Sequence, residues 1–376
     1  MKNTVFCSSV AAAVLLPVVS ASAMEIRTCG SQIRTVPLND ERQVNSMIVQ
    51  SFAVVNNGPT PAKLENVTLE LSKNDVVSDK RVLGPDLVAR AAALAPRIEG
   101  LAKLVPSQFC NGSLIDGVTL AKSELMLPGE SLVFLQQLFV WSGSRDTLRI
   151  SAGGAFANLS IASGPSKTRA LFPIPGLTFV GIGPALHGHH RWVALQEFAF
   201  DIAKLGNGRT HRSQGTKVTD YFVYGQPVRA VADGKVAVAV MDKADSVDQL
   251  QRAGEADDAY LARVGEAQAA LVSKGFDAIL GNHVVIDHGN GEFSVYAHLK
   301  PGSIKVRAGD NVLAGSVFAA VGSSGNSTQP HLHFQMSDCA DVKACRSIPV
   351  NFEGIRLPVD QTQRTLQSGD IVETLK

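Results

Sequence analysis

The sequence GSSGNSTQPHLHFQM spans residues 322–336, and its segment HLHF places His331 and His333 on either side of Leu332. If this segment is a strand, side chains two residues apart lie on the same face. Both histidines then share one face, while Leu332 and Phe334 point into the core. Two histidines on one face can still be bystanders, so their meaning depends on other residues of metal-ligand type.

Three further segments supply such residues. Asp201 lies in the alternating apolar stretch FAFDIA, and His298 ends the stretch FSVYAH, where it is expected to share a face with Tyr296. The loop segment HGHH at 187–190 adds three more histidines. A carboxylate inside an apolar strand is costly to bury without a cationic partner. That partner is either a metal ion or an Arg or Lys side chain.

This inventory fits one zinc ion. Zinc binds imidazole nitrogen and carboxylate oxygen, and a catalytic zinc site combines three protein ligands with one position for water. The chain has no H-E-x-x-H segment, so a hydrolase built here is not of the helical zincin type.

Length and composition indicate a folded chain of two domains. The 376 residues are 45% hydrophobic and 18% charged, which is enough apolar material for real cores. The formal net charge is +1, so nucleic acid is not an expected partner.

The N-terminus is typical of a signal peptide over residues 1–23. Lys2 precedes an apolar stretch, and Ala21-Ser22-Ala23 forms a small-residue cleavage site. A membrane anchor is the alternative, but the apolar run is short for a spanning helix. We therefore expect an exported protein, periplasmic or secreted, with no membrane span after cleavage.

Four cysteines remain after the predicted cleavage: Cys29, Cys110, Cys339 and Cys345. An even number in an exported chain indicates disulfides. Proximity favours Cys339–Cys345 and leaves Cys29–Cys110, although three pairings are open on the sequence alone.

The fold is predicted to be mainly β. Residues 24–165 are expected to form an N-terminal β-sandwich-like domain, of unknown role, with a helical insertion. The predicted apolar face of that helix consists of Leu87, Leu94, Ile98 and Leu101. Pro96 is expected to kink or break it.

The rest of the chain divides into three segments. Residues 166–184 are rich in Pro and Gly and are predicted to be a linker. Residues 185–354 alternate short strands with glycine turns and form a second β domain with a helical insertion at 244–275. Residues 355–376 are a polar C-terminal tail.

Five segments of the second domain follow one another along the chain: FAFDIA, GQPVRAVADGKV, GNHVVIDHGNGEFSVYAHL, VRAGDNVLAGSVFAAVGSSGNST and PHLHF. In these segments and in their order, the chain from about residue 180 to 352 resembles the M23 (LytM/lysostaphin-type) zinc metallopeptidases. These enzymes cut peptide bonds in bacterial cell-wall peptidoglycan. The resemblance implies an antiparallel β domain of the LytM/M23 type and does not extend to residues 24–165.

The resemblance also implies roles. His190, Asp201 and His333 would bind one Zn²⁺, with His189 as the alternative to His190. His298 and His331 would be catalytic residues beside the water that zinc activates. The usual first motif is H-x-x-x-D, whereas His190 and Asp201 are eleven residues apart here. The ligand among His187, His189 and His190 therefore stays open.

The resulting prediction is an exported zinc metalloendopeptidase acting on peptidoglycan peptides. Two alternatives are a non-catalytic LytM-like protein that binds cell wall or regulates an amidase, and a zinc peptidase acting on protein substrates. The presence of Asp201, His298, His331 and His333 favours an enzyme. Residues 24–165 and 244–275 are the candidates for docking a regulatory protein partner.

Overall fold

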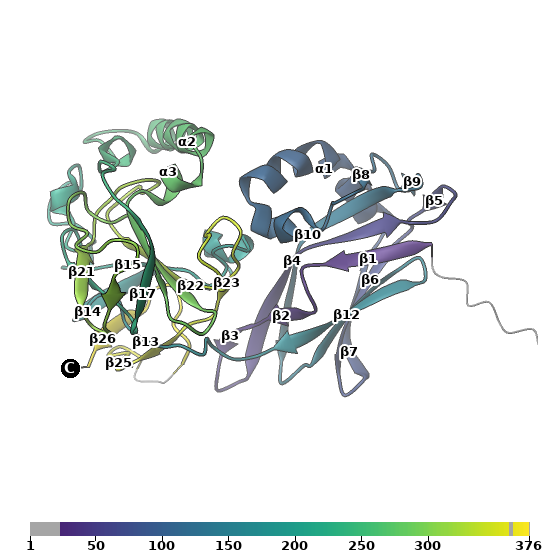
Figure 1. Cartoon of the computed structure of the whole chain (residues 1–376), viewed down its shortest axis with the longest axis horizontal. Coiled ribbons are helices and arrows are strands. Elements are labelled where there is room, and N and C mark those ends of the chain that lie inside the picture. The colour runs from purple at the N-terminus through teal and green to yellow at the C-terminus, as the bar shows by residue number, and fades with distance from the viewer. Residues whose placement is uncertain (1–22, 361–363, 376) are drawn as a thin grey trace, which may run out of the picture.

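The computed structural model describes residues 23–360 and 364–375. The predicted signal peptide, residues 1–23, lies outside the described residues except for Ala23. Within the described part, no helix is long and apolar enough to cross a membrane. Figure 1 shows two β-rich parts side by side, the N-terminal one in purple and blue and the C-terminal one in green and yellow.

The N-terminal part contains two five-stranded sheets. One sheet has β1 (Met24–Thr28), β3 (Val36–Asn39), β4 (Val44–Asn56), β8 (Thr119–Leu120) and β10 (Glu130–Ser142). The other has β2 (Gln32–Arg34), β6 (Val67–Lys73), β7 (Val76–Leu83), β11 (Thr147–Ala152) and β12 (Ala155–Ala162). A two-stranded sheet, β5 (Ala62–Lys63) with β9 (Leu125–Met126), completes it.

The two sheets pack face to face through their alternating apolar residues. Phe52 and Val54 of β4 and Leu69 and Leu71 of β6 belong to one buried cluster. Between the β6 leucines, Glu70 stays partly exposed, as a half-buried strand requires. The predicted β-sandwich is confirmed.

The predicted helical insertion is present as α1 (Pro85–Leu104), followed by the 3₁₀ segment η1 (Pro106–Gly112). The predicted break at Pro96 is wrong, because the helix continues through it. The predicted apolar face is also partly wrong, since Leu87 and Leu101 are exposed. The buried face is formed by Val88, Ala91, Ala92, Ala95 and Ile98. Small alanine side chains let the helix lie close to the sheet.

Both favoured disulfides are present. Cys29 pairs with Cys110, and Cys339 pairs with Cys345. The first links the end of β1 to η1. The second joins two cysteines six positions apart and closes a short loop directly after the HLHF strand.

The C-terminal part is built on a ten-stranded sheet, and its strands are antiparallel, as predicted. Its path is β20 (Asn311–Val312), β17 (Gly234–Val240), β18 (His283–Asp287), β19 (Phe293–Ala297), β22 (Leu332–Ser337), β15 (Phe200–Ala203), β14 (Leu177–Ile182), β26 (Ile371–Thr374) and β25 (Ile355–Arg356). Strand β23 (Ser347–Ile348) also pairs with β22. Two smaller sheets pair β13 (Arg169–Leu171) with β24 (Asn351–Glu353) and β16 (Pro227–Arg229) with β21 (Val317–Ala320).

Two predicted connecting segments contribute strands to these sheets. Residues 166–184, predicted as a linker, contain β13 and β14, and residues 355–376, predicted as a polar tail, contain β25 and β26. Strand β14 pairs with both β15 and β26. Both segments therefore form part of the sheets of the C-terminal part. The limits 24–165 and 185–354 for the two domains stay a proposal.

The helical insertion predicted at 244–275 contains one α-helix, α2 (Asp257–Ser273), and a second short helix, α3 (Phe276–Leu280), begins just after it. Figure 1 places α2 and α3 at the same end of the molecule as α1, on the other side of the gap between the two parts. The remaining 3₁₀ turns are η2 (His189–Trp192), η3 (Val218–Asp220) and η4 (Val247–Gln249).

Candidate metal centre

Three neighbouring strands bring the predicted site residues together. Strand register pairs Asp201 of β15 with His333 of β22, and His333 with Ala297 of β19. Leu332 and Phe334 lie in the main buried cluster, so the intervening His333 faces the opposite side. The one-face prediction for the HLHF segment is confirmed.

A single carboxylate oxygen, Asp201 Oδ1, lies near three imidazole rings. Its distance is 2.9 Å to His190 Nε2, 3.1 Å to His333 Nδ1 and 3.5 Å to His331 Nε2. The side chains of Asp201, His190 and His333 are between 6% and 14% exposed. Asp201 therefore contacts histidines, and these contacts include no salt bridge to Arg or Lys, which was one of the two expected partners.

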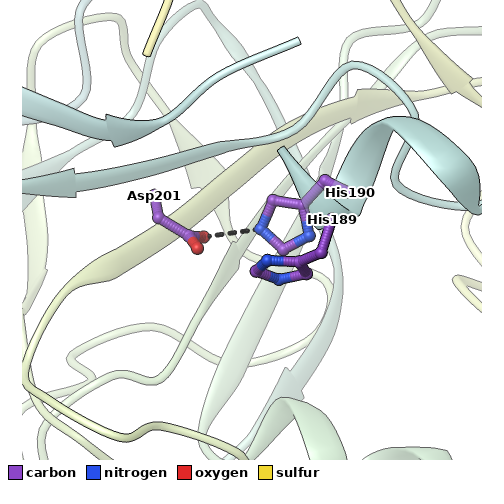
Figure 2. A group of neighbouring side chains, drawn as sticks. All are labelled: His189, His190 and Asp201. Carbon is purple, nitrogen blue, oxygen red and sulfur yellow. Dashed lines mark ion pairs between the residues drawn. The ribbon is translucent and has the colours of Figure 1, made fainter. Parts of the chain in front are cut away.

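The histidine loop places its members differently. His190 is buried, whereas His187 and His189 are exposed. The rings of His189 and His190 are 4.1 Å apart, and His189, His190 and Asp201 each offer a ligand atom within 4.8 Å of the others. Figure 2 shows the contact between Asp201 and His190 as a dashed line, with the His189 ring beneath it.

Burial sets the charges in this group. Burial lowers the pKa of His190 to about 4, although Asp201 opposes this shift. Burial alone would raise the pKa of Asp201, but the neighbouring His190 and His331 hold that pKa well below its usual range. At neutral pH the group therefore contains an ionised carboxylate beside a neutral His190.

The two histidines predicted as catalytic have their Nδ1 atoms fixed by main-chain carbonyls. His298 Nδ1 lies 2.8 Å from Ser324 O, and His331 Nδ1 lies 2.8 Å from Gln329 O. A carbonyl oxygen can only accept, so each Nδ1 carries the hydrogen and each neutral ring keeps a bare Nε2. The two rings are 4.7 Å apart.

His298 is held in a costly conformation. Its φ of 61° lies in the left-handed region, which residues with a side chain rarely adopt. Burial, followed by the neighbouring His331 and His333, lowers the pKa of His298 well below its ordinary value. A strained, buried histidine whose pKa is shifted in this way is typical of a functional site.

Residues 214–344 match the family model described as peptidase family M23. The C-terminal part of this chain contains a peptidase M23 domain at residues 214–344. The matched residues include His298, His331 and His333, and begin after His190 and Asp201.

The chain is also similar to curated proteins. Over 95 residues, 25% of this chain, it is 37% identical to the DD-carboxypeptidase/endopeptidase Mpg of Neisseria meningitidis serogroup B, and covers 20% of that protein. Over 173 residues, 46% of this chain, it is 28% identical to the murein hydrolase activator EnvC of Escherichia coli K12, and covers 27% of it. The chain thus spans less than a third of the length of these relatives.

Two solved structures are similar to the chain. The catalytic domain of the prophage-encoded M23 protein EnpA from Enterococcus faecalis matches at 19% identity and a TM-score of 0.28, covering 49% of this chain and 95% of that one. The catalytic domain of the antimicrobial peptidase lysostaphin from Staphylococcus simulans matches at 20% identity and a TM-score of 0.26, covering 45% and 86%.

Gln335 is a residue of the M23 domain site that the sequence analysis missed. Its Nε2 donates to Leu195 O and to Ser337 Oγ, each at 2.8 Å, which fixes the orientation of the amide. Its Oε1 therefore faces His333 Nε2 at 3.1 Å and must accept the hydrogen from that nitrogen. In the neutral ring His333 Nδ1 is then bare and faces Asp201. The available signal was its position two residues after His333, on the same strand face.

Substitution of Gln335 tests whether its amide orients the His333 ring. Gln335→Met keeps the volume but loses the acceptor, so the orientation of the His333 ring is no longer fixed. We expect zinc affinity, measured by competition with a chelator, to fall about 10- to 100-fold, as for other supports of metal-binding histidines. Gln335→Glu retains an acceptor for His333 Nε2–H but loses the bond that the amide donates to Leu195 O, so its zinc affinity is expected to lie between those of the Met variant and the wild type. Equal affinity of the Met variant and the wild type would contradict this role.

The site of the M23 domain opens into a cavity of about 300 Å³. Its lining contains His189, His190, Asp201, His298, His331 and His333. His187 does not line it. Apolar walls come from Leu104 and Val105 at the end of α1 and from Phe276 and Leu280 of α3. The cleft is therefore formed by both parts of the chain, and no residue pattern in 24–165 had indicated this.

Two other polar residues are not part of the site. Tyr296 is buried, where its hydroxyl receives a hydrogen bond from Val231 N at 2.9 Å, so packing explains it. His283 is also buried, with Nδ1 2.9 Å from Gly281 O.

Proposed function

We propose that this chain is an exported zinc metalloendopeptidase that hydrolyses peptide bonds of bacterial peptidoglycan. The observation that carries the proposal is the convergence of three imidazole nitrogens within 3.5 Å of Asp201 Oδ1. The similarity to the DD-carboxypeptidase/endopeptidase Mpg supports a peptidase acting on the cell wall.

The residues present fit a zinc ion. His190 is buried, yet neither of its ring nitrogens has a hydrogen-bond partner of ordinary geometry among the described residues. His333 Nδ1 and Asp201 Oδ1, both acceptors when the ring is neutral, face each other at 3.1 Å. Such lone pairs repel unless a cation is shared between them. Neutral imidazoles and an ionised carboxylate are the forms that zinc requires.

In this proposal His190, Asp201 and His333 hold the ion. Zinc, when bound, supplies a Lewis acid and lowers the pKa of water to about 7. His189, exposed and close to His190, is the alternative ligand.

The proton transfers are assigned to His298 and His331. Each presents a bare Nε2 because its Nδ1–H is held by a main-chain carbonyl. A neutral imidazole can take a proton from the attacking water and return it to the leaving amine. The imidazolium that forms in between can donate a hydrogen bond to the oxyanion of the tetrahedral intermediate. Burial of His298 keeps it in the neutral form that a base requires.

Export is part of the proposal. The segment 1–23 is typical of a signal peptide, and two disulfides are expected in an oxidising compartment, periplasmic or secreted. A regulatory protein would dock on 24–165 or 244–275, since both segments supply walls of the cavity or lie next to them.

A second candidate is favoured by the similarity to the murein hydrolase activator EnvC: a non-catalytic protein that binds cell wall or regulates an amidase. The combination of metal-binding and catalytic residues argues against it, because a regulator does not need Asp201, His298, His331 and His333 in one cluster.

Digestion of purified peptidoglycan sacculi separates the candidates. The wild type with zinc is expected to release soluble peptides, whereas the wild type with chelator and the His333→Ala variant are not. Equal binding without release in all three samples would favour the regulator. Cleavage of a protein such as casein, without release from sacculi, would favour a peptidase of protein substrates.

A further inference from the structure

The segment that carries His190 is held by three glutamines of the N-terminal part, two on strands of the sandwich and one on η1. The bonds run from Gln50 Nε2 to Arg191 O (3.0 Å), from Gln136 Nε2 to Trp192 O (2.8 Å) and from Ala194 N–H to Gln108 Oε1 (2.8 Å). We call Gln50, Gln108 and Gln136 the glutamine cluster. It satisfies three main-chain polar groups within four residues, directly after His190.

Two members of the cluster are linked to each other. Gln108 Nε2 donates to both Gln50 O (2.9 Å) and Gln50 Oε1 (3.1 Å). Gln50 and Gln108 are only 4% and 6% exposed. Because the amides are buried and bonded at both ends, each has one orientation available, and a connected network of this kind specifies a unique geometry.

Arg191 adds a second tie between the same segment and the sandwich. Its guanidinium is fully buried, pairs with Glu197 and lies 3.4 Å from Ser46 O on β4. A buried charge keeps its position because losing its partners would be costly. The residue next to His190 is therefore inserted into the N-terminal part.

Gln136 contributes its hydrogen bond from a strained backbone conformation. Its φ of 53° lies in the left-handed region, in the middle of β10. The pairs Leu135–Ser51 and Gln137–Val49 place it opposite Gln50. Strained backbone persists where surrounding contacts hold it, and here it accompanies the bond to Trp192.

The metal centre needs such support at His190 in particular. Asp201 and His333 are fixed by pairing between β15 and β22, but His190 lies on the turn η2, outside the sheet. We infer that the N-terminal sandwich is part of the metal centre, and that Gln50, Gln108 and Gln136 are positioning residues that direct His190 toward Asp201. This inference rests on the proposed function in that His190 is taken as a zinc ligand.

The test uses two variants of the full chain. Gln108→Met removes the acceptor for Ala194 N–H at constant volume. Gln136→Gly removes the bond to Trp192 and at the same time relieves the left-handed backbone, which glycine adopts freely. We expect each variant to bind zinc about 10- to 100-fold more weakly by chelator competition. We also expect faster amide hydrogen exchange over residues 188–197 in the metal-free protein.

Gln136→Gly separates positioning from general stability. Its unfolding midpoint without metal is expected to equal or exceed that of the wild type, while zinc affinity falls. A purely structural role would move both quantities in the same direction. The matched control is Arg346→Met, which removes another bond between the two parts, to Cys29 O at 3.1 Å, without touching residues 188–197. Its zinc affinity is expected to stay within about twofold of the wild type, since its bond supports none of the groups that hold His190.

The outcomes are distinguishable. If the wild type binds zinc and Gln136→Gly binds it equally well with unchanged exchange over 188–197, the inference is overturned. If the wild type binds no zinc, the proposed function fails, while hydrogen exchange still reports whether the glutamine cluster holds the segment. Weakened binding in Arg346→Met as well would also overturn the inference, because any interface contact would then suffice.

Discussion

Asp201→Ala will leave the protein folded but without bound zinc and without activity. Asp201 Oδ1 is the atom that His190, His331 and His333 all approach, so its removal takes away the only negative charge of the cluster. A catalytic metal supplies several kcal/mol of transition-state stabilisation, and each ~1.4 kcal/mol is a factor of ten. We therefore expect kcat/KM for peptide hydrolysis to fall about a thousandfold or more, with metal content near zero by elemental analysis.

The control for this variant is Asp287→Ala. Asp287 lies at the end of β18, and its carboxylate accepts only from Gly289 N among the bonds of the described residues. Zinc content and activity are expected to stay at wild-type values. Full zinc occupancy in Asp201→Ala would show that the carboxylate is not a ligand.

His298→Ala will separate metal binding from proton transfer. His298 lies in the cavity with its Nδ1–H on Ser324 O. It is not among the histidines that approach Asp201 Oδ1 within 3.5 Å, which are His190, His331 and His333. Removing a general acid or base typically costs 10²- to 10⁴-fold in rate. We expect a loss of about that size in kcat with zinc content unchanged.

His187→Ala is the matched control for this second variant. His187 is an exposed histidine of the HGHH loop outside the cavity, so neither zinc content nor kcat is expected to change. Loss of zinc from His298→Ala would assign that residue to the ligands instead. A kcat within tenfold of the wild type would remove it from the chemistry.

Local patterns predicted the parts of the site that lie on strands. Alternation in FAFDIA and HLHF placed Asp201 and His333 on polar faces because a strand has a period of two, and pairing of β15 with β22 then brings the two side chains within 3.1 Å. The sandwich in 24–165 followed from the same period.

The remaining features depend on contacts between distant segments. Leu87 and Leu101 were predicted to lie on the apolar face of the helix, but α1 buries its alanines instead. Which face of the helix packs against the sheet depends on the shape of the sheet surface, and the helix sequence alone does not contain this information. The roles of Gln50 and Gln108 were equally hidden, since a glutamine carries no local signal of a partner 141 or 86 residues further along the chain. His190 could be proposed from the resemblance, but not preferred to His189 on spacing alone.

The most direct test is anomalous X-ray diffraction at the zinc edge from crystals of the full chain grown with zinc. The account predicts one strong peak in the cavity, roughly 2.0–2.2 Å from His190 Nε2, an oxygen of Asp201 and His333 Nδ1. A map with no peak between Asp201 and His333 would contradict it.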